Sequence, residues 1–574
     1  MKFRSAEWFW GRDELGLQHR SALRTMGIEA ERFRTRPVIG IANSWSELNN
    51  CNINLREIAE AVKRGVLAAG GLPLEFPTIS LGEEFMKPTA MLYRNLMAMD
   101  VEETLRSNPI DAVVLLGNCD KTIPAQLMAA ASANLPAIQV SGGPRPAAWW
   151  NGNEIGSGTD LWKYWDDYRT GRITESDWHE LEQCMSCGVG ACNVMGTAST
   201  MACLAEAMGM MLPGAATICA TDPRRILTAE ASGRRIVELA GQDLRPSDIM
   251  TPAAFDNAIR VCMALGGSTN AIIHLIAIAG RLGTDLELRR FDELSRSTPY
   301  LVDVKPSGRY LMAEFDAAGG VPAVMKELGS LLDGECRTIT GKTIRENLES
   351  AEGANSGVIR PLSKPLSAEG AIVTLHGNLA PNGAVLKISA ASRHLLQHTG
   401  RAVVFEDYAD MLAHIEHDGL DVNESSVLVM KNCGPKGVPG MPEWGSIPIP
   451  AKLQRRGIHD MVRISDGRMS GTSYGTVVLH VSPESAAGGP LAAVRTGDEI
   501  RLDVPRRRVE LLLPDAEIGQ RLASTLPPSS AHLRGYPRLY IDHVLQADQG
   551  CDFDFLRPKR AEELSFVQPI VGRS

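Results

Sequence analysis

The chain has 574 residues, of which 44% are hydrophobic and 22% charged, and its formal net charge is −9. These values are typical of globular proteins of several domains and exclude a disordered or fibrous chain. The acidic balance also lacks the basic surface that binding to nucleic acid requires, so we expect no nucleic acid partner.

The sequence predicts a cytoplasmic protein with reduced thiols. Residues 1–10 lack the apolar core of a signal peptide, and no later window approaches the roughly 18 apolar residues of a membrane span, so we expect no membrane partner. The chain contains 11 Cys, an odd number. Without a secretory signal these are not expected to form a disulfide framework, and some of them are candidate metal ligands.

The first 150 residues alternate short apolar runs with helical patterns, which predicts a parallel sheet flanked by helices. The predicted strands are 37–43, 74–80, 111–117 and 137–141. Ligands of such sheets bind beyond the carboxyl ends of the strands. The loops at those ends contain Cys51, Glu83-Glu84, Cys119-Asp120-Lys121 and Gly142-Gly143.

The rest of the chain predicts buried helices followed by a β-rich part. A Trp-rich segment, 149–178, is interpreted as a cover or a subunit contact, and 190–211 and 266–280 have the composition of buried helices. Residues 351–365 resemble a linker in composition. We therefore expect an α/β fold with an N-terminal domain, 1–360, that carries the parallel sheet, and a barrel-like or sandwich C-terminal domain, 361–574.

Three thiols are placed where a site could use them. Cys51 and Cys119 follow predicted strands, and Cys192 opens the predicted helix 190–211, whose dipole would stabilise a thiolate. A free Cys on its own is more often a small buried hydrophobe, so the argument rests on three loops that meet at one edge. Cys184 and Cys187 form a CxxC that could also bind zinc or a cluster.

Glu83, Asp120 and Glu443 are candidate ligands of Mg²⁺, which prefers carboxylate oxygens. Lys121 is unusual beside such a site because an ammonium repels a cation. It could bind the carboxylate of a substrate, or it could ligate the metal after carboxylation to a carbamate.

A Ser- and Gly-rich loop, 463–475, precedes an apolar run. Its composition is typical of a turn capped by Ser side chains. Alternatively, Ser470 is a base whose alkoxide is stabilised by a neighbouring cation.

Several motifs together resemble the dihydroxyacid and sugar-acid dehydratases. They occur in the expected order between about residues 36 and 490, and they are Cys119-Asp120-Lys121-Thr122-Ile123-Pro124-Ala125, Cys192-Asn193, Gly266-Gly267-Ser268-Thr269-Asn270, Gly434-Pro435-Lys436-Gly437 and Ser465-Asp466-Gly467-Arg468-Met469-Ser470-Gly471-Thr472. The resemblance implies a hydro-lyase that removes water from a 2,3-dihydroxy carboxylate to give a 2-keto acid, with an iron–sulfur cluster and Mg²⁺ as cofactors.

The resemblance assigns the cluster to Cys51, Cys119 and Cys192. It implies a [2Fe-2S] cluster, with [4Fe-4S] as the alternative. Three protein thiolates leave one iron with an open position, which lets that iron act as a Lewis acid rather than an electron carrier.

The resemblance also implies that Mg²⁺ is held by Glu83, Asp120, carboxylated Lys121 and Glu443. The alkoxide of Ser470 would then remove the C2 proton of the substrate. A homodimer or homotetramer is the implied assembly.

The substrate branch is predicted from three further segments. Arg4-Ser5 with Trp8-Phe9, His19-Arg20-Ser21 and residues 87–95 look like the sugar-acid branch, which acts on compounds such as L-arabinonate, D-xylonate or D-gluconate. One alternative is the dehydratase of branched-chain amino-acid synthesis, which converts 2,3-dihydroxyisovalerate to 2-ketoisovalerate, or an enzyme that accepts both. A remote alternative is a non-catalytic iron–sulfur or zinc protein in which Cys184, Cys187 and Cys192 complete the metal shell.

Overall fold

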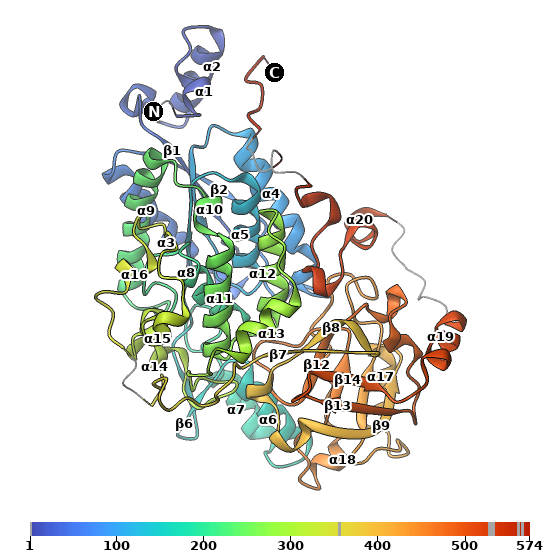
Figure 1. Ribbon diagram of the computed structural model, residues 1–574. Helices are drawn as coiled ribbons and strands as arrows, with labels where there is room; N and C mark the ends of the chain where they lie inside the picture. The colour runs from blue at the N-terminus through green and yellow to red at the C-terminus, as the bar shows by residue number, and fades with distance from the viewer. Residues whose placement is uncertain (1–2, 354–356, 526–533, 560–562, 564–566, 574) are drawn as a thin grey trace.

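Figure 1 shows the chain as a computed structural model, which describes residues 3–353, 357–525, 534–559, 563 and 567–573. A helix-rich part surrounds a four-stranded sheet, and a separate β-barrel follows it in the chain. No helix in these ranges is long and apolar enough to cross a membrane.

The N-terminal sheet is parallel with the order β2-β1-β3-β4, which confirms the prediction. The strands are β1 (Val38–Asn43), β2 (Leu72–Pro77), β3 (Ala112–Leu116) and β4 (Ala137–Val140). Strands β1, β3 and β4 are buried at every position. They read as continuous apolar runs because helices cover both faces of the sheet.

Helices pack closely around the sheet (Figure 1). Helix α3 (Leu55–Ala68) lies against α9 (Arg224–Gln242), and a Cβ at Gly65 would stand 2.0 Å from the carbonyl oxygen of Glu230. Only glycine permits this approach. The other long helices of this part are α2 (Glu14–Thr25), α4 (Arg94–Ser107), α5 (Thr122–Ala133), α6 (Thr159–Arg169), α7 (Glu175–Cys184), α8 (Thr197–Ala207), α11 (Pro252–Leu265), α12 (Asn270–Arg281), α13 (Leu288–Arg296) and α15 (Gly320–Leu328).

The two predicted buried helices are present, but both start later than expected, at Thr197 instead of 190 and at Asn270 instead of 266. Helices α8 and α12 are buried along their whole length. Gly190 has a φ of +121°, and the chain runs as a loop until α8 begins at Thr197. The prediction that Cys192 opens a helix is therefore wrong, and a loop holds this thiol instead.

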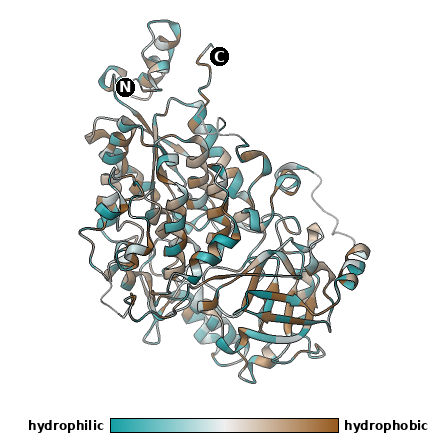
Figure 2. Ribbon diagram, in the orientation of Figure 1, coloured by the Kyte–Doolittle hydropathy of each residue, from teal (hydrophilic) through white to brown (hydrophobic). Residues whose placement is uncertain are grey.

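The C-terminal part contains a closed barrel with the order β10-β11-β12-β8-β7-β14-β13-β9, which confirms the predicted β-rich architecture. Figure 2 shows hydrophobic residues along its strands interspersed with hydrophilic ones. The strands are β7 (Val373–Gly377), β8 (Ala380–Leu386), β9 (Gln397–Phe405), β10 (Val427–Met430), β11 (Arg463–Ser465), β12 (Val477–Ser482), β13 (Glu499–Asp503) and β14 (Arg508–Leu511).

The chain crosses between the two parts more than once. Residues 354–356 of the predicted linker lie outside the described residues, but Ile359 pairs with Val302 of the helical part. After the barrel come α19 (Asp515–Ser524) and α20 (Gly535–His543). Beyond α20, Asp552 forms a fully buried ion pair of 2.6 Å with Arg281 of α12. The division into residues 1–360 and 361–574 stays a prediction.

Candidate active site

The candidate site lies where the carboxyl ends of two sets of parallel strands meet. In the barrel, the loops after β10 and β11 carry Glu443 and Ser470. A contact of 2.9 Å between Lys121 Nζ and Glu443 Oε1 joins the sheet side to the barrel side. On the sheet side, the loops after β1 to β4 carry Cys51, Glu83, Cys119 to Lys121, and Arg145.

Three carboxylates surround the ammonium group of Lys121. One oxygen each from Glu83, Asp120 and Glu443 lies within 4.8 Å of the other two. Lys121 Nζ stands 2.5 Å from Asp120 Oδ2, 2.9 Å from Glu443 Oε1 and 3.0 Å from Glu83 Oε2. The lysine is fully buried, so this cation contacts protein oxygens in place of water.

Mutual charge sets the protonation of this cluster. Burial lowers the pKa of Lys121, but Asp120, Glu443 and Glu83 together raise it above its usual value. Burial raises the pKa of Glu443, but Lys121 and Arg468 outweigh it and bring that pKa to about 2. Glu83 has a raised pKa, chiefly because it is buried. Without a metal, Lys121 is therefore an ammonium and Glu443 a carboxylate.

The donor set fits Mg²⁺. The Lys121 ammonium, which lies within 3.0 Å of an oxygen of each group, shows that the three carboxylates converge on a cation. Lys121 and Arg468 are positive and the three carboxylates are negative, so the net charge of these five groups is −1. Carboxylation of Lys121 would make it −3, because a cation would become an anion. Hard oxygen donors of this kind suit Mg²⁺.

Two residues to which the sequence assigned no role hold Glu443 in place. Arg468 NH1 donates to Glu443 Oε1 at 3.0 Å, and Asn270 Nδ2 donates to the same oxygen at 3.2 Å. Arg468 NH2 also reaches Thr89 Oγ1 at 3.2 Å, and that hydroxyl donates to Glu83 Oε1 at 2.6 Å. Arg468 and Asn270 lie within two of the family motifs, and this is the sequence feature that could have identified them.

Amide side chains tie the thiol loops together. Asn118 Nδ2 donates to the carbonyl oxygen of Cys51 at 2.8 Å, and the backbone N–H of Cys119 donates to Asn52 Oδ1 at 3.1 Å. Cys51 and Cys119 are buried, and Cys192 is half-buried. The loops after β1 and β3 are therefore held to each other independently of any metal.

The thiols influence one another electrostatically. A hydrogen bond with Cys51, together with burial, raises the pKa of Cys119 well above its usual value. Burial also raises the pKa of Cys192, to about 12, although the charge of Arg145 opposes the rise. In the absence of a metal Cys119 and Cys192 are therefore protonated.

The chemistry of the thiol set suits an iron–sulfur cluster, because Cys thiolates are the usual protein ligands of such clusters.

A buried guanidinium stands beside the thiols. Arg145 is 5% exposed, and its NH2 lies 3.6 Å from Glu84 Oε1. Burial lowers the pKa of Arg145, but Cys192, Cys51 and Glu84 raise it above the usual value. Glu84 thus faces the thiol loops, while its neighbour Glu83 faces the Mg²⁺ cluster. In the sequence Arg145 is a lone Arg after Gly-Gly-Pro, and none of the motifs identified there includes it.

Ser470 is half-buried in the loop between β11 and β12. Its Oγ lies 2.9 Å from Thr472 Oγ1 and accepts a hydrogen bond of 3.3 Å from the backbone N–H of Thr472. Trp162 Nε1 donates to Thr472 Oγ1 at 3.3 Å, so part of the Trp-rich segment covers this loop. Asn270 Nδ2 donates to the carbonyl oxygen of Met469 at 3.1 Å. One amide therefore links the Ser470 loop to Glu443.

The two thiols of the CxxC, Cys184 and Cys187, have surroundings that differ from those of Cys51, Cys119 and Cys192. Cys184 packs in a hydrophobic cluster with Leu181 and Trp178, and Cys187 is exposed.

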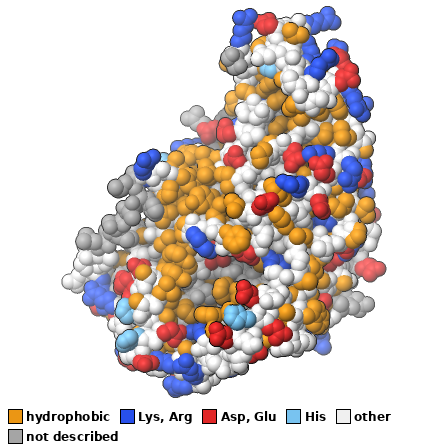
Figure 3. All heavy atoms as spheres, turned by 180° about the vertical axis from the view of Figure 1, so that it is seen from behind, with side chains coloured by type: hydrophobic (Ala, Val, Ile, Leu, Met, Phe, Trp, Pro, Cys, Tyr) orange, Lys and Arg blue, Asp and Glu red, His pale blue; other side chains and the backbone are white. Residues whose placement is uncertain are grey.

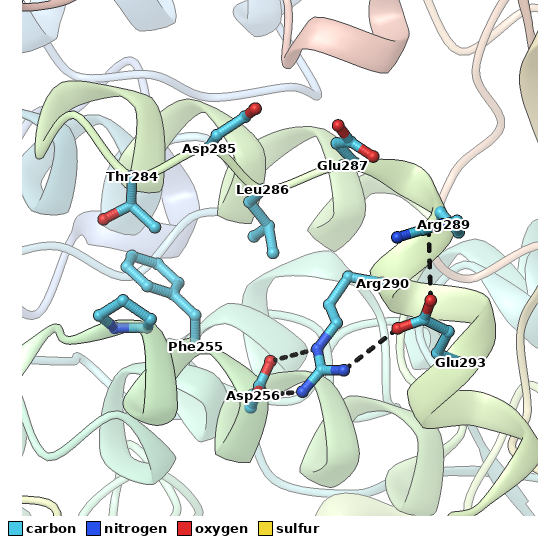
Figure 4. A pocket seen from close by; sticks show the side chains of 10 residues that line it. Phe255, Asp256, Thr284, Asp285, Leu286, Glu287, Arg289, Arg290 and Glu293 are labelled. Atoms are coloured by element: carbon cyan, nitrogen blue, oxygen red, sulfur yellow. Dashed lines mark hydrogen bonds and ion pairs between the residues drawn. The ribbon is translucent and has the colours of Figure 1, made fainter.

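A surface pocket of about 410 Å³ between α11 and α13 contains none of the predicted site residues (Figure 4). Four of its six charged side chains pair with one another. Arg290 binds Asp256 with two hydrogen bonds and also contacts Glu293, which pairs with Arg289. The pocket therefore offers only Asp285 and Glu287 as further charged groups, and these two do not define a ligand site.

Comparison with known proteins gives matches along nearly the whole chain. Residues 36–347 match the dihydroxy-acid/6-phosphogluconate dehydratase N-terminal family, and residues 357–551 match the C-terminal one. An L-arabonate dehydratase of Azospirillum brasilense is 53% identical over 572 residues, covering 98% of each chain. An L-arabinonate dehydratase of Rhizobium leguminosarum is 52% identical over 558 residues, covering 97% of this chain and 96% of the relative.

A 6-deoxy-6-sulfo-D-gluconate dehydratase of Pseudomonas putida is 46% identical over 563 residues, covering 98% of this chain and 97% of the relative. Several dihydroxy-acid dehydratases are more distant, at 38% to 42% identity. The resemblance predicted from the motifs is therefore confirmed.

Proposed function

We propose a sugar-acid substrate for this chain, which belongs to the dihydroxy-acid/6-phosphogluconate dehydratase family and is therefore a hydro-lyase. The proposed reaction removes water from L-arabinonate, D-xylonate or D-gluconate and gives the 2-keto-3-deoxy acid. The C2 proton and the C3 hydroxyl leave, and the resulting enol becomes the keto acid by tautomerisation. The higher identity to sugar-acid dehydratases than to dihydroxy-acid dehydratases supports this branch.

The proposed cofactors are an iron–sulfur cluster and Mg²⁺. Cys51, Cys119 and Cys192 would hold the cluster as [2Fe-2S], with [4Fe-4S] as the alternative, and Glu83, Asp120, carboxylated Lys121 and Glu443 would hold Mg²⁺. When bound, the two groups supply Lewis acids for the hydroxyl groups and the carboxylate of the substrate. The observation that carries the proposal is that Cys119 Sγ lies 3.5 Å from Asp120 Oδ1, so that the thiol set and the carboxylate set adjoin.

Ser470 is the proposed base. A free serine hydroxyl is a weak base, so its alkoxide needs stabilisation. The N–H of Thr472 supplies one hydrogen bond, and the Thr472 hydroxyl can supply a second because Trp162 already donates to it. The loop also lies against the N-terminus of α8: a Cβ at Gly471 would stand 2.5 Å from the backbone nitrogen of Thr197. The positive end of a helix dipole favours an anion there.

A homodimer or homotetramer in the cytoplasm completes the proposal. Broad hydrophobic patches cover part of the rear face (Figure 3), and Trp149 and Trp165 are among the exposed large hydrophobic residues. Patches of this kind are typical of subunit contacts. All 11 Cys are free, which suits a reducing compartment. Analytical ultracentrifugation would test the assembly, and a monomer at micromolar concentration would contradict it.

The experiment that tests the function is an anaerobic assay of 2-keto acid formation with Mg²⁺. L-Arabinonate, D-xylonate, D-gluconate and 2,3-dihydroxyisovalerate are compared side by side at equal enzyme and cluster content. Turnover of a sugar acid with little on the isovalerate supports the proposal, and the reverse result identifies the branched-chain alternative. An iron-loaded protein that converts none of them would support the non-catalytic alternative.

A further inference from the structure

Arg145 is fixed against the loop that carries Cys192. Its backbone N–H donates to the carbonyl oxygen of Ala191 at 2.8 Å, and its Nε donates to the same oxygen at 3.3 Å. NH1 donates to Ser186 Oγ at 2.8 Å. Because Ala191 immediately precedes Cys192, these bonds hold the guanidinium in a set position relative to the thiol.

The remaining nitrogen of this side chain has no hydrogen bond to an oxygen, and the Cys51 thiol lies close enough to bond the guanidinium. Arg145 NH2 is buried without a hydrogen bond partner, and its nearest carboxylate oxygen, Glu84 Oε1, lies 3.6 Å away. A buried charged donor without a partner is costly. Arg145 interacts electrostatically with both Cys51 and Cys192. The free donor thus stands among the thiols, where the group held by them would lie.

We propose that Arg145 is a positioning residue for the iron–sulfur cluster, to which its NH2 donates a hydrogen bond and whose negative charge its guanidinium stabilises. This inference rests on the proposed function, because it requires the three thiols to hold a cluster. Outer hydrogen bonds and net charge are the means by which proteins tune such clusters. Arg145 would therefore raise the reduction potential of the cluster, since the reduced form carries one more negative charge.

The proposal predicts a larger effect in the loaded protein than in the metal-free one. In both forms a neutral replacement of Arg145 removes its bonds to Ala191 and Ser186 and its contact with Glu84, so both forms lose some stability. With the cluster, the same replacement removes a charge-assisted hydrogen bond. A purely structural role would instead destabilise both forms alike.

The experiment compares wild type, Arg145→Met and Arg145→Lys, each reconstituted with iron and sulfide under anaerobic conditions. Thermal unfolding is measured for the metal-free and loaded forms. Loss of cluster iron to a chelator and the potential of the cluster, followed by electron paramagnetic resonance, are measured for the loaded forms. We expect Arg145→Met to lose cluster iron about 10- to 100-fold faster and to have a lower potential. Its unfolding temperature should fall by more in the loaded form than in the metal-free form. Arg145→Lys keeps the charge and should retain a potential closer to that of wild type.

Glu84→Gln is the matched control. Its carboxylate is half-exposed beside the guanidinium, and loss of its negative charge should shift the potential in the opposite direction from Arg145→Met. The proposal is overturned if Arg145→Met keeps wild-type potential and iron retention, or if it destabilises the metal-free form as much as the loaded one. If wild type itself takes up no cluster on these thiols, the proposed function fails instead, so the two failures are distinguishable.

Discussion

Arg468 and Glu443 form a buried ion pair in which NH1 of the arginine donates to Oε1 of the glutamate at 3.0 Å. Arg468 stands two residues before Ser470, so this pair joins the loop of the proposed base to the carboxylates of the proposed Mg²⁺ site. Asn270 strengthens the connection by donating to both Glu443 and Met469. The loop of the proposed base and the carboxylates of the proposed Mg²⁺ site are thus held in fixed relative positions by one network of buried polar groups.

Arg468→Gln should disconnect this network. Removing one partner of a buried ion pair costs about 3–5 kcal/mol of stability, and Glu443 would lose the cation that helps to keep it ionised. We expect a lower denaturation midpoint and weaker binding of Mg²⁺, measured by calorimetry on the cluster-loaded protein. Unchanged Mg²⁺ affinity in a folded variant would show that Arg468 does not position Glu443.

Ser470→Ala should abolish turnover while leaving both metal groups bound. Removal of a general base lowers the rate by about 10²- to 10⁴-fold. The keto acid assay gives the rate, and the absorption spectrum and metal content show whether the cluster and Mg²⁺ remain. Normal turnover in a fully loaded variant would remove Ser470 from the role of base.

Thr472→Val should weaken the proposed base without removing it. The valine keeps the shape of the side chain but loses the hydroxyl that lies 2.9 Å from Ser470 Oγ. A hydrogen bond to a charged group contributes about 1.5–3 kcal/mol, so we expect kcat to fall by roughly 10- to 100-fold. The acid limb of the pH profile should also move to higher pH.

Two tryptophan variants test the same chain of donors. Trp162→Phe removes the donor to Thr472 Oγ1 and should reduce kcat by about fivefold, the equivalent of about 1 kcal/mol. Trp165→Phe is the control, because this ring packs against Tyr168 and Trp178 instead. Equal effects of the two variants would contradict the assignment.

Carboxylation of Lys121 should occur together with Mg²⁺ binding. In the metal-free site the surrounding carboxylates raise the pKa of Lys121, so the neutral amine that reacts with carbon dioxide is scarce. We expect a ¹³C carbamate resonance when ¹³C-bicarbonate and Mg²⁺ are present together, and none with bicarbonate alone. Lys121→Arg keeps the charge but cannot be carboxylated, and it should bind Mg²⁺ weakly. Full Mg²⁺ affinity in that variant would contradict the carbamate.

His480 should make the protein less stable as the pH falls below about 6.5. Burial and the charge of Arg468 lower its pKa to about 3 in the folded state, so the unfolded chain binds the proton first and unfolding is favoured between these values. At pH 5 this single group would cost about 2 kcal/mol.

His480→Asn should reduce that loss of stability. Asn is the suitable replacement because residue 480 has a φ of +57°, which Asn tolerates better than most residues. Urea denaturation midpoints at pH 7 and pH 5 give the comparison for both proteins. An equal pH dependence in wild type and variant would contradict the low pKa of His480.

The sequence by itself determined the parallel sheet, its buried helices and the residue types of the candidate site. These features depend on the period of apolar residues and on contiguous motifs, both of which are local properties of the chain. Beyond residue 361 the sequence predicts β-like runs at 370–375, 402–406, 427–430, 476–481 and 508–513. It misses β8, β11 and β13, because these strands are short or contain residues such as Pro381 and Gly383 that are typical of turns. Barrel closure supplies their hydrogen-bonding partners.

Only the tertiary structure decided how the site residues are held. Lys121 and Glu443 are 322 residues apart in the chain, and neither the pairing of their charges nor the roles of Arg145 and Arg468 follow from local patterns. Cys192 was expected at a helix N-terminus, but positive φ at Gly190 and the bonds of Ala191 hold it in a loop. Burial of a charged side chain depends on which distant groups surround it, and that is settled when the sheet and the barrel pack together.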